Sequence, residues 1–107
     1  MFQKDFQKIF LEAVEEGLLT LGETPKQAIL FHLENTFKIK REEIPQNLTE
    51  FQKALEKIFG HGASYLEKLI LKKLYDKFQL EFEETENPPN LINSVENLKK
   101  RIFSGDA

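Results

Sequence analysis

Two histidines, His32 and His61, have the widest range of chemistry in this chain, because an imidazole can bind a metal or transfer a proton near neutral pH. They lie far apart in the sequence, and neither belongs to an HExxH motif or to a paired histidine spacing. His61 stands between two glycines, a position where histidines commonly hydrogen-bond the free carbonyls of a helix C-terminus. We therefore expect neither histidine to be catalytic or to bind a metal.

Carboxylates gather in the run EFEETE at 81–86 and in the pairs Glu15-Glu16 and Glu42-Glu43. The run lacks the DxDxDG spacing of a calcium loop, and adjacent helical residues point about 100° apart, which does not suit an acid–base couple. The chain also has no cysteine and no phosphate loop, nucleophile elbow or dinucleotide fingerprint. The sequence therefore predicts a protein that is not an enzyme and holds no metal or cofactor.

Basic side chains gather in two segments and raise the alternative of a nucleic-acid partner. They are Lys38, Lys40, Arg41, Lys68, Lys72, Lys73 and Lys77. The second group lies on a predicted helix that follows a glycine corner at 60–62, an arrangement that resembles a helix-turn-helix in outline. The net charge of −3 and the apolar residues on two sides of this helix favour a solvated lysine face over DNA binding.

Apolar residues at spacings of three and four predict the helices that must position these side chains. We expect helices over about 3–21, 25–37, 47–59, 63–80 and 90–103. Between the second and third helices, a short helical turn that ends at Pro45 is expected to place Ile39 and Ile44 in the core. Thr24 and Asn47 begin capping-box-like signals, and most of the ten phenylalanines are expected in the core.

These elements predict an all-α protein, a compact bundle of about five helices without a sheet. A length of 107 residues suits one small domain, which we divide into a helical core over 1–80, an acidic, proline-containing hinge over 81–90, and a C-terminal helix with a frayed tail over 91–107. No window approaches the roughly 18 apolar residues of a membrane span, and the lack of cysteine fits a reducing compartment. We expect a cytoplasmic protein that does not contact a membrane.

Several apolar residues fall outside the main stripe of their helix or form a seam on the last helix. They are Leu11, Leu19, Leu71, Tyr75, Leu91, Val95, Leu98 and Ile102. The last helix either docks on its own domain or packs against its equivalent in a symmetric dimer. We favour a homodimer that uses these residues as its protein interface.

A set of residues between Leu18 and Phe78 carries a resemblance to a known family. The set comprises Leu21-Gly22-Glu23, Ile29, His32-Leu33-Glu34, Phe37, Ile44-Pro45, Phe51, Ala54-Leu55, Ile58-Phe59-Gly60, Gly62-Ala63 and Leu66-Glu67. With these residues the segment resembles the Nitrosopumilus-type output domain, a small archaeal helical family formerly described as a domain of unknown function. The resemblance implies a signalling or regulatory output and supplies no catalytic residue.

We therefore expect a non-catalytic regulatory module that acts through helix-mediated contacts with a protein partner or with a second copy of itself. The alternative is a DNA-binding transcription regulator that uses the third helix, the glycine corner, the fourth helix and the nearby lysines.

Overall fold

The computed structural model describes residues 3–82 and 90–103. The elements are α1 (Gln3–Leu19), α2 (Glu23–Asn35), the 3-10 helix η1 (Arg41–Gln46), α3 (Leu48–Phe59), the 3-10 helix η2 (Gly60–Gly62), α4 (Ala63–Lys77) and α5 (Leu91–Phe103). Helices account for 84% of the described residues, and no strand occurs among them. The predicted all-α class is therefore confirmed.

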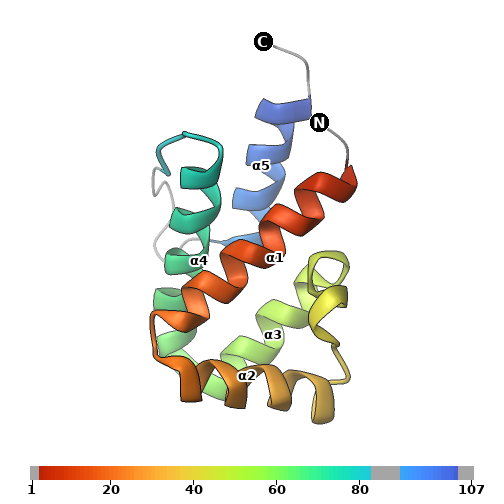
Figure 1. The fold of residues 1–107 in the computed structure, drawn as a ribbon, viewed down its shortest axis with the longest axis vertical. Coiled ribbons are helices and arrows are strands. Elements are labelled where there is room, and N and C mark those ends of the chain that lie inside the picture. Colours follow the sequence, from red (N-terminus) through yellow and green to blue (C-terminus); the bar gives the residue numbers. More distant parts are fainter. Residues whose placement is uncertain (1–2, 83–89, 104–107) are drawn as a thin grey trace.

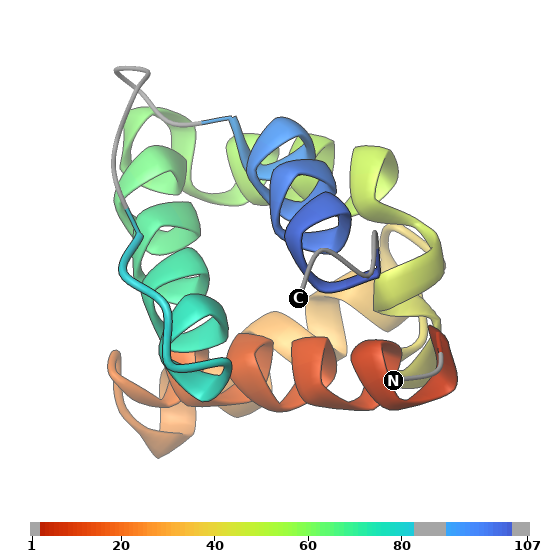
Figure 2. The ribbon, with the colours of Figure 1, turned by 90° about the horizontal axis from the view of Figure 1, so that it is seen from above.

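α4 is the central helix of the bundle, because α1, α3 and α5 all pack against it. α1 crosses α4 diagonally, and α2 lies across one end of the molecule below α3 (Figure 1). Seen from above, α1 and α4 form two adjoining sides, and α5 stands between α4 and the η1 side (Figure 2). At the crossing of α1 and α4, a Cβ atom built on Gly17 would lie 2.8 Å from Cγ1 of Ile70, so the close approach requires a glycine.

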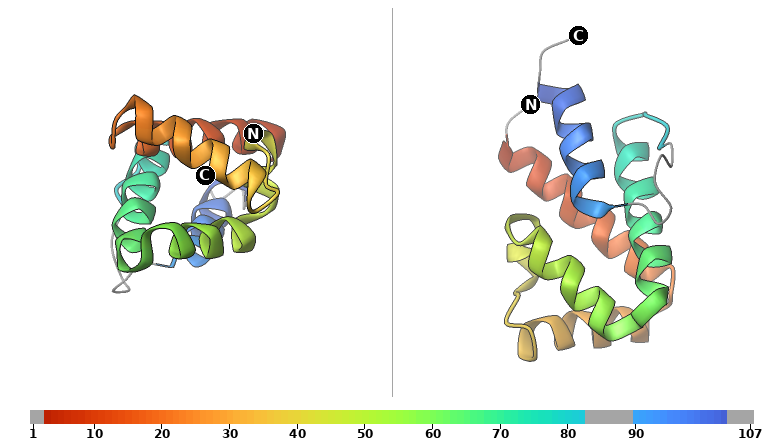
Figure 3. Two further views of the ribbon diagram at one scale, coloured as in Figure 1. Left: turned by 90° about the horizontal axis from the view of Figure 1, so that it is seen from below. Right: turned by 180° about the vertical axis from the view of Figure 1, so that it is seen from behind.

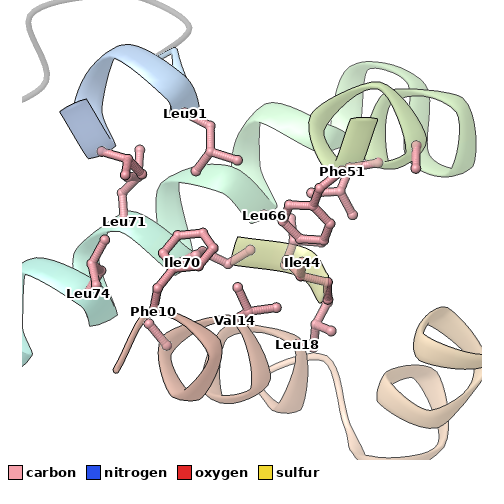
Figure 4. Close-up of a cluster of buried hydrophobic side chains, with 14 of the residues drawn as sticks. Phe10, Val14, Leu18, Ile44, Phe51, Leu66, Ile70, Leu71, Leu74 and Leu91 are labelled. Carbon is pink, nitrogen blue, oxygen red and sulfur yellow. The ribbon is translucent and has the colours of Figure 1, made fainter. Parts of the chain in front are cut away.

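The core is built from the apolar stripes of all the helices and from the turn before α3 (Figure 4). Ile39 and Ile44 are buried, which confirms their predicted place in the core. Of the ten phenylalanines, Phe6, Phe10 and Phe51 are buried, and five more pack partly buried against the core. The expectation that most phenylalanines are core residues is therefore confirmed.

Two helices end earlier than predicted, because the chain turns through a residue in the left-handed conformation that is not glycine. After α4, Gln79 has φ 59°, and the amide of Leu80 donates to the carbonyl of Tyr75 at 3.0 Å, as in a Schellman motif. After α2, Lys38 has φ 61°. α1 also ends two residues before the predicted boundary, at Leu19.

The predicted side-chain caps of α2 and α3 are wrong. α2 begins at Glu23 after Gly22, without a capping side chain, and Gln27 donates to the Glu23 carboxylate at 3.2 Å instead of reaching back to Thr24. Asn47 donates its amide to the carbonyl of Glu43 at 2.8 Å. Its side chain therefore stabilises the end of η1 rather than the first turn of α3.

α5 packs against α4 and α3 of its own chain. The hydroxyl of Tyr75 on α4 donates to the carbonyl of Ser94 on α5 at 2.7 Å, and Leu91, Val95 and Leu98 are buried. Most of the predicted hinge, 83–89, and the predicted frayed tail, 104–107, lie outside the described residues.

Candidate functional site

α2 carries the most exposed large apolar side chain of the described residues. Phe31 is 68% exposed, ahead of Tyr65 at 61% and Leu19 at 47%. Because α2 buries only Ile29 and Leu33, much of its surface faces outward, and Phe31 stands on that outward side.

The exposed stripe around Phe31 carries one charged residue, Glu34, in a chain of which 31% of the residues are charged. Its members lie three, four or seven positions from Phe31 along the chain, which places them on one side of the helix. We call this stripe the α2 face; it consists of Thr24, Gln27, Ala28, Phe31, Glu34 and Asn35, all exposed. An exposed stripe with an aromatic centre and a single charge is typical of a helix surface that contacts another protein.

A hollow of about 390 Å³ lies beside the α2 face and is lined by Ala28, Ile29, Phe31, His32 and Ile58. α2 lies along one end of the molecule, and α3 is the next helix above it (Figure 3, right).

A second hollow, of about 180 Å³, is lined by Phe37, Ile39, Glu50, Lys53, Ala54 and Lys57. Because Ala54 and Ile58 are one turn apart on α3, the two hollows follow each other along that helix. We call them together the α2–α3 groove. Its walls are mostly apolar, with Glu50, Lys53 and Lys57 on the α3 side.

The two histidines do not form a site together. Nδ1 of His32 lies 3.0 Å from the hydroxyl of Thr36, and its ring meets the Phe37 ring edge-on at 5.8 Å, so His32 shapes the wall of the groove. His61 is exposed in η2, and its backbone carbonyl accepts from the Ser64 hydroxyl at 3.2 Å. Within the described ranges, no group of three or more His, Asp or Glu side chains is arranged to hold a metal ion.

The residues predicted as a protein interface are mostly inside the fold. Five of them are buried in the core of their own chain: Leu71, Tyr75, Leu91, Val95 and Leu98. Leu11 and Ile102 are partly buried against that core, and Leu19 is 47% exposed. The additional apolar residues of α4 and the apolar seam of α5 pack against each other. The last helix therefore docks on its own domain, which is one of the two arrangements expected from the sequence. The homodimer stays a prediction, but these residues do not form a continuous surface for it.

The predicted basic residues do not form one patch. Lys38, Lys40 and Arg41 lie at η1, on the opposite side of the molecule from α4, which carries Lys68, Lys72, Lys73 and Lys77 (Figures 1 and 2).

Two of these cations are paired with carboxylates of α1. Nζ of Lys77 lies 2.6 Å from Glu16 and 3.7 Å from Glu12, and its hydrogen bond to Glu16 raises the pKa of Lys77. Arg41 pairs with Glu15. Lys72 and Lys73 remain exposed on α4.

A buried carboxyl group on α4 was not predicted from the sequence. Glu67 is 3% exposed, and neither its Oε2 nor the buried Oε1 of Gln52 on α3 has a hydrogen-bond partner. Burial, and then the charge of Glu56, raise the pKa of Glu67 from its usual 4.5 to about 7. The available signal was the helical period, which places position 67 near the apolar Ala63 and Leu71 of α4.

Comparison of the chain with family models, with curated proteins and with solved structures gives no match. The resemblance to the output-domain family therefore stays a prediction. Within the described part of the chain, no helix combines the length and the apolar character that crossing a membrane requires.

Proposed function

We propose that this protein is a non-catalytic regulatory or signalling module that acts through protein–protein contact at the α2 face and the α2–α3 groove. One observation carries the proposal: Phe31 stands 68% exposed at the edge of a mostly apolar hollow of about 390 Å³. Aromatic side chains beside such hollows are the usual anchors of helix-mediated interfaces. The implied relation to an output-domain family supports the regulatory role.

The structure favours this proposal over the alternative of a DNA-binding regulator. A recognition helix must present one face to the major groove, whereas α4 is packed by α1, α3 and α5. Two of the predicted phosphate contacts, Arg41 and Lys77, are also paired with carboxylates. A titration of labelled duplex DNA at low and moderate salt tests the alternative, because micromolar binding with a steep salt slope would support it.

We also propose that the protein works in the cytoplasm. A chain without cysteine needs no oxidising compartment for its stability.

Photo-crosslinking tests the contact surface directly. A photoreactive phenylalanine analogue replaces Phe31 in cells that make the protein, and the same analogue replaces the exposed Lys72 on α4 as a matched control. We expect a protein adduct from position 31 and none, or a weaker one, from position 72. A lack of any protein adduct from position 31 would contradict the proposed function.

A further inference from the structure

We propose that Glu67 is a proton-dependent latch that holds α5 on the bundle. While its carboxyl group is protonated, α5 docks on α4 and α3 as observed, and loss of the proton loosens the first turns of α5. The latch concerns contacts inside the chain, so it goes beyond the contact surface proposed above and does not depend on it.

Glu67 lies on the row of α4 that faces α5, close to the point where α5 begins. Residues 67, 71 and 75 are spaced by four positions and therefore lie one above another on the helix. The Tyr75 hydroxyl donates to the carbonyl of Ser94 at 2.7 Å, and Leu71 points toward α5 (Figure 4). α4 and α5 run in the same direction (Figures 1 and 3), and Leu91 comes one turn before Ser94. The level of Glu67 on α4 therefore corresponds to the junction at which α5 enters the bundle.

Two buried oxygen atoms on the sides of α3 and α4 that meet α5 accept no hydrogen bond from the described residues. They are Oε1 of Gln52 and Oε2 of Glu67. Gln52 comes one turn after Leu48, which lines a hollow together with Ile92 of α5. A buried acceptor without a donor is costly, and the cost rises steeply when the group carries a negative charge. The docked arrangement therefore favours the neutral, protonated carboxyl group.

The charges around Glu67 do not compensate an ionised carboxylate. Glu67 is 3% exposed, and burial, together with the negative charge of Glu56 on α3, raises its pKa to about 7. Among the described groups, no cation contributes to this pKa. On α1, Glu16 pairs with Lys77 toward the other end of α4. The charged residues of α5 all come after its first turn: Glu96, Lys99, Lys100 and Arg101.

The first turns of α5 are the part of the fold that opens most easily to admit water to Glu67. α1 makes the most extensive contact with α4, whereas α5 makes smaller contacts with α4 and α3. The other end of α5 is also held by α1, because the rings of Phe103 and Phe6 lie 6.0 Å apart. Elements with fewer buried contacts open at a lower free energy than the centre of a fold. Ionisation of Glu67 therefore loosens the beginning of α5 before it disturbs the crossing of α1 and α4.

The latch opens as the pH rises. Opening exposes Glu67 to water and returns its pKa to the usual 4.5, whereas the docked state holds it at about 7. Docking is therefore strongest below pH 4.5, weakens up to about pH 7 and changes little above that. These two pKa values predict that the equilibrium constant for opening increases about tenfold between pH 6 and pH 8.

Labelling of single thiols in the folded protein measures this opening, because the chain has no cysteine of its own. Val95→Cys reports on α5, and Val14→Cys on α1 is the matched control, since both valines are 0% exposed. Each labelling rate is divided by that of the same variant unfolded in urea at the same pH, which removes the ionisation of the thiol itself. We expect Val95→Cys to react faster than Val14→Cys, and its corrected rate to rise about tenfold from pH 6 to pH 8.

Glu67→Gln tests the role of the proton, because it keeps the size of the side chain and cannot ionise. Added to Val95→Cys, it should remove the rise with pH, whereas the exposed Glu42→Gln should leave the rise in place. Equal labelling of Val95→Cys and Val14→Cys at every pH would overturn the proposal, because α5 would then open only when the whole fold unfolds. A rise that persists in the presence of Glu67→Gln would overturn it as well.

Amide hydrogen exchange gives a second measurement that needs no cysteine. The exchange rate of each α5 amide in the wild type is divided by its rate in Glu67→Gln at the same pH, so that the intrinsic pH dependence of exchange cancels. We expect this ratio to increase about tenfold from pH 6 to pH 8 in the first turns of α5. A ratio that does not change with pH would overturn the latch.

Discussion

The ionisation of Glu67 makes the stability of the fold depend on pH in a predictable direction. Its side chain is 3% exposed, and burial together with the charge of Glu56 raises its pKa from 4.5 to about 7. Between these two values the folded chain keeps the proton while the unfolded chain releases it. The free energy of unfolding therefore falls as the pH rises from about 4.5 to about 7 and levels off above that range.

The size of this effect follows from the two pKa values. At roughly 1.4 kcal/mol per pKa unit, a pKa raised from 4.5 to about 7 corresponds to about 3 kcal/mol of stability lost at pH 8 relative to pH 4. Glu67→Gln keeps the shape of the protonated side chain and removes the titration. The variant should therefore be more stable than the wild type at pH 8, by about 3 kcal/mol more than at pH 4.

Urea denaturation of both proteins between pH 4 and pH 8 measures this difference. The exposed Glu42→Gln is a matched control, because it removes a carboxylate from the surface and should follow the pH dependence of the wild type. Glu56→Gln removes the second cause of the raised pKa, so it should reduce the pH dependence without abolishing it. A stability difference between Glu67→Gln and wild type that does not change with pH would refute the reasoning.

Three further substitutions test the packing. Gly17→Ala should destabilise the fold by roughly 1–3 kcal/mol in thermal or chemical denaturation, because the added Cβ would lie 2.8 Å from Ile70. Gly62→Ala is the control and should not destabilise the fold, because its Cβ would have no neighbour closer than 3.7 Å. Equal effects of the two variants would contradict this account. Tyr75→Phe loses the hydrogen bond to α5 and should cost about 1 kcal/mol and speed amide hydrogen exchange in α5; unchanged exchange would contradict it. Gln79→Gly should stabilise the fold by about 0.5–1 kcal/mol, because Gln79 has φ 59°, and a loss of stability would contradict this.

The helical periods were sufficient to predict the fold class and the existence of each of the five α-helices in the described residues, because every one of them buries a stripe of apolar residues. They were less informative at the helix ends. Lys38 and Gln79 adopt the left-handed conformation, which sequence alone suggests mainly at glycine or asparagine. Tertiary packing, rather than the local preference of these residues, determines where α2 and α4 stop.

The surface was harder to predict than the core, because exposure depends on which neighbours cover a residue. The seam on α5 indicated an interface, but its partner is α4 of the same chain. Most phenylalanines were expected in the core, and the sequence did not single out Phe31 as the exposed one, because hydrophobicity alone does not separate an exposed aromatic from a buried one. Glu67 is the opposite case, a charged residue that is buried. Its charge indicated the surface, while the helical period placed it inside.

The central position of α4 has a consequence for how the chain folds during synthesis. α1 packs against α4 more extensively than against its sequence neighbours, and the ion pair between Glu16 and Lys77 spans 61 positions. Although α2 and η1 also pack against α1, the apolar stripe of α1, with Phe10, Val14 and Leu18, is therefore only partly covered until α4 has left the ribosome. At a synthesis rate of about 5–20 residues per second, several seconds pass between the synthesis of α1 and that of α4, which completes the core around it.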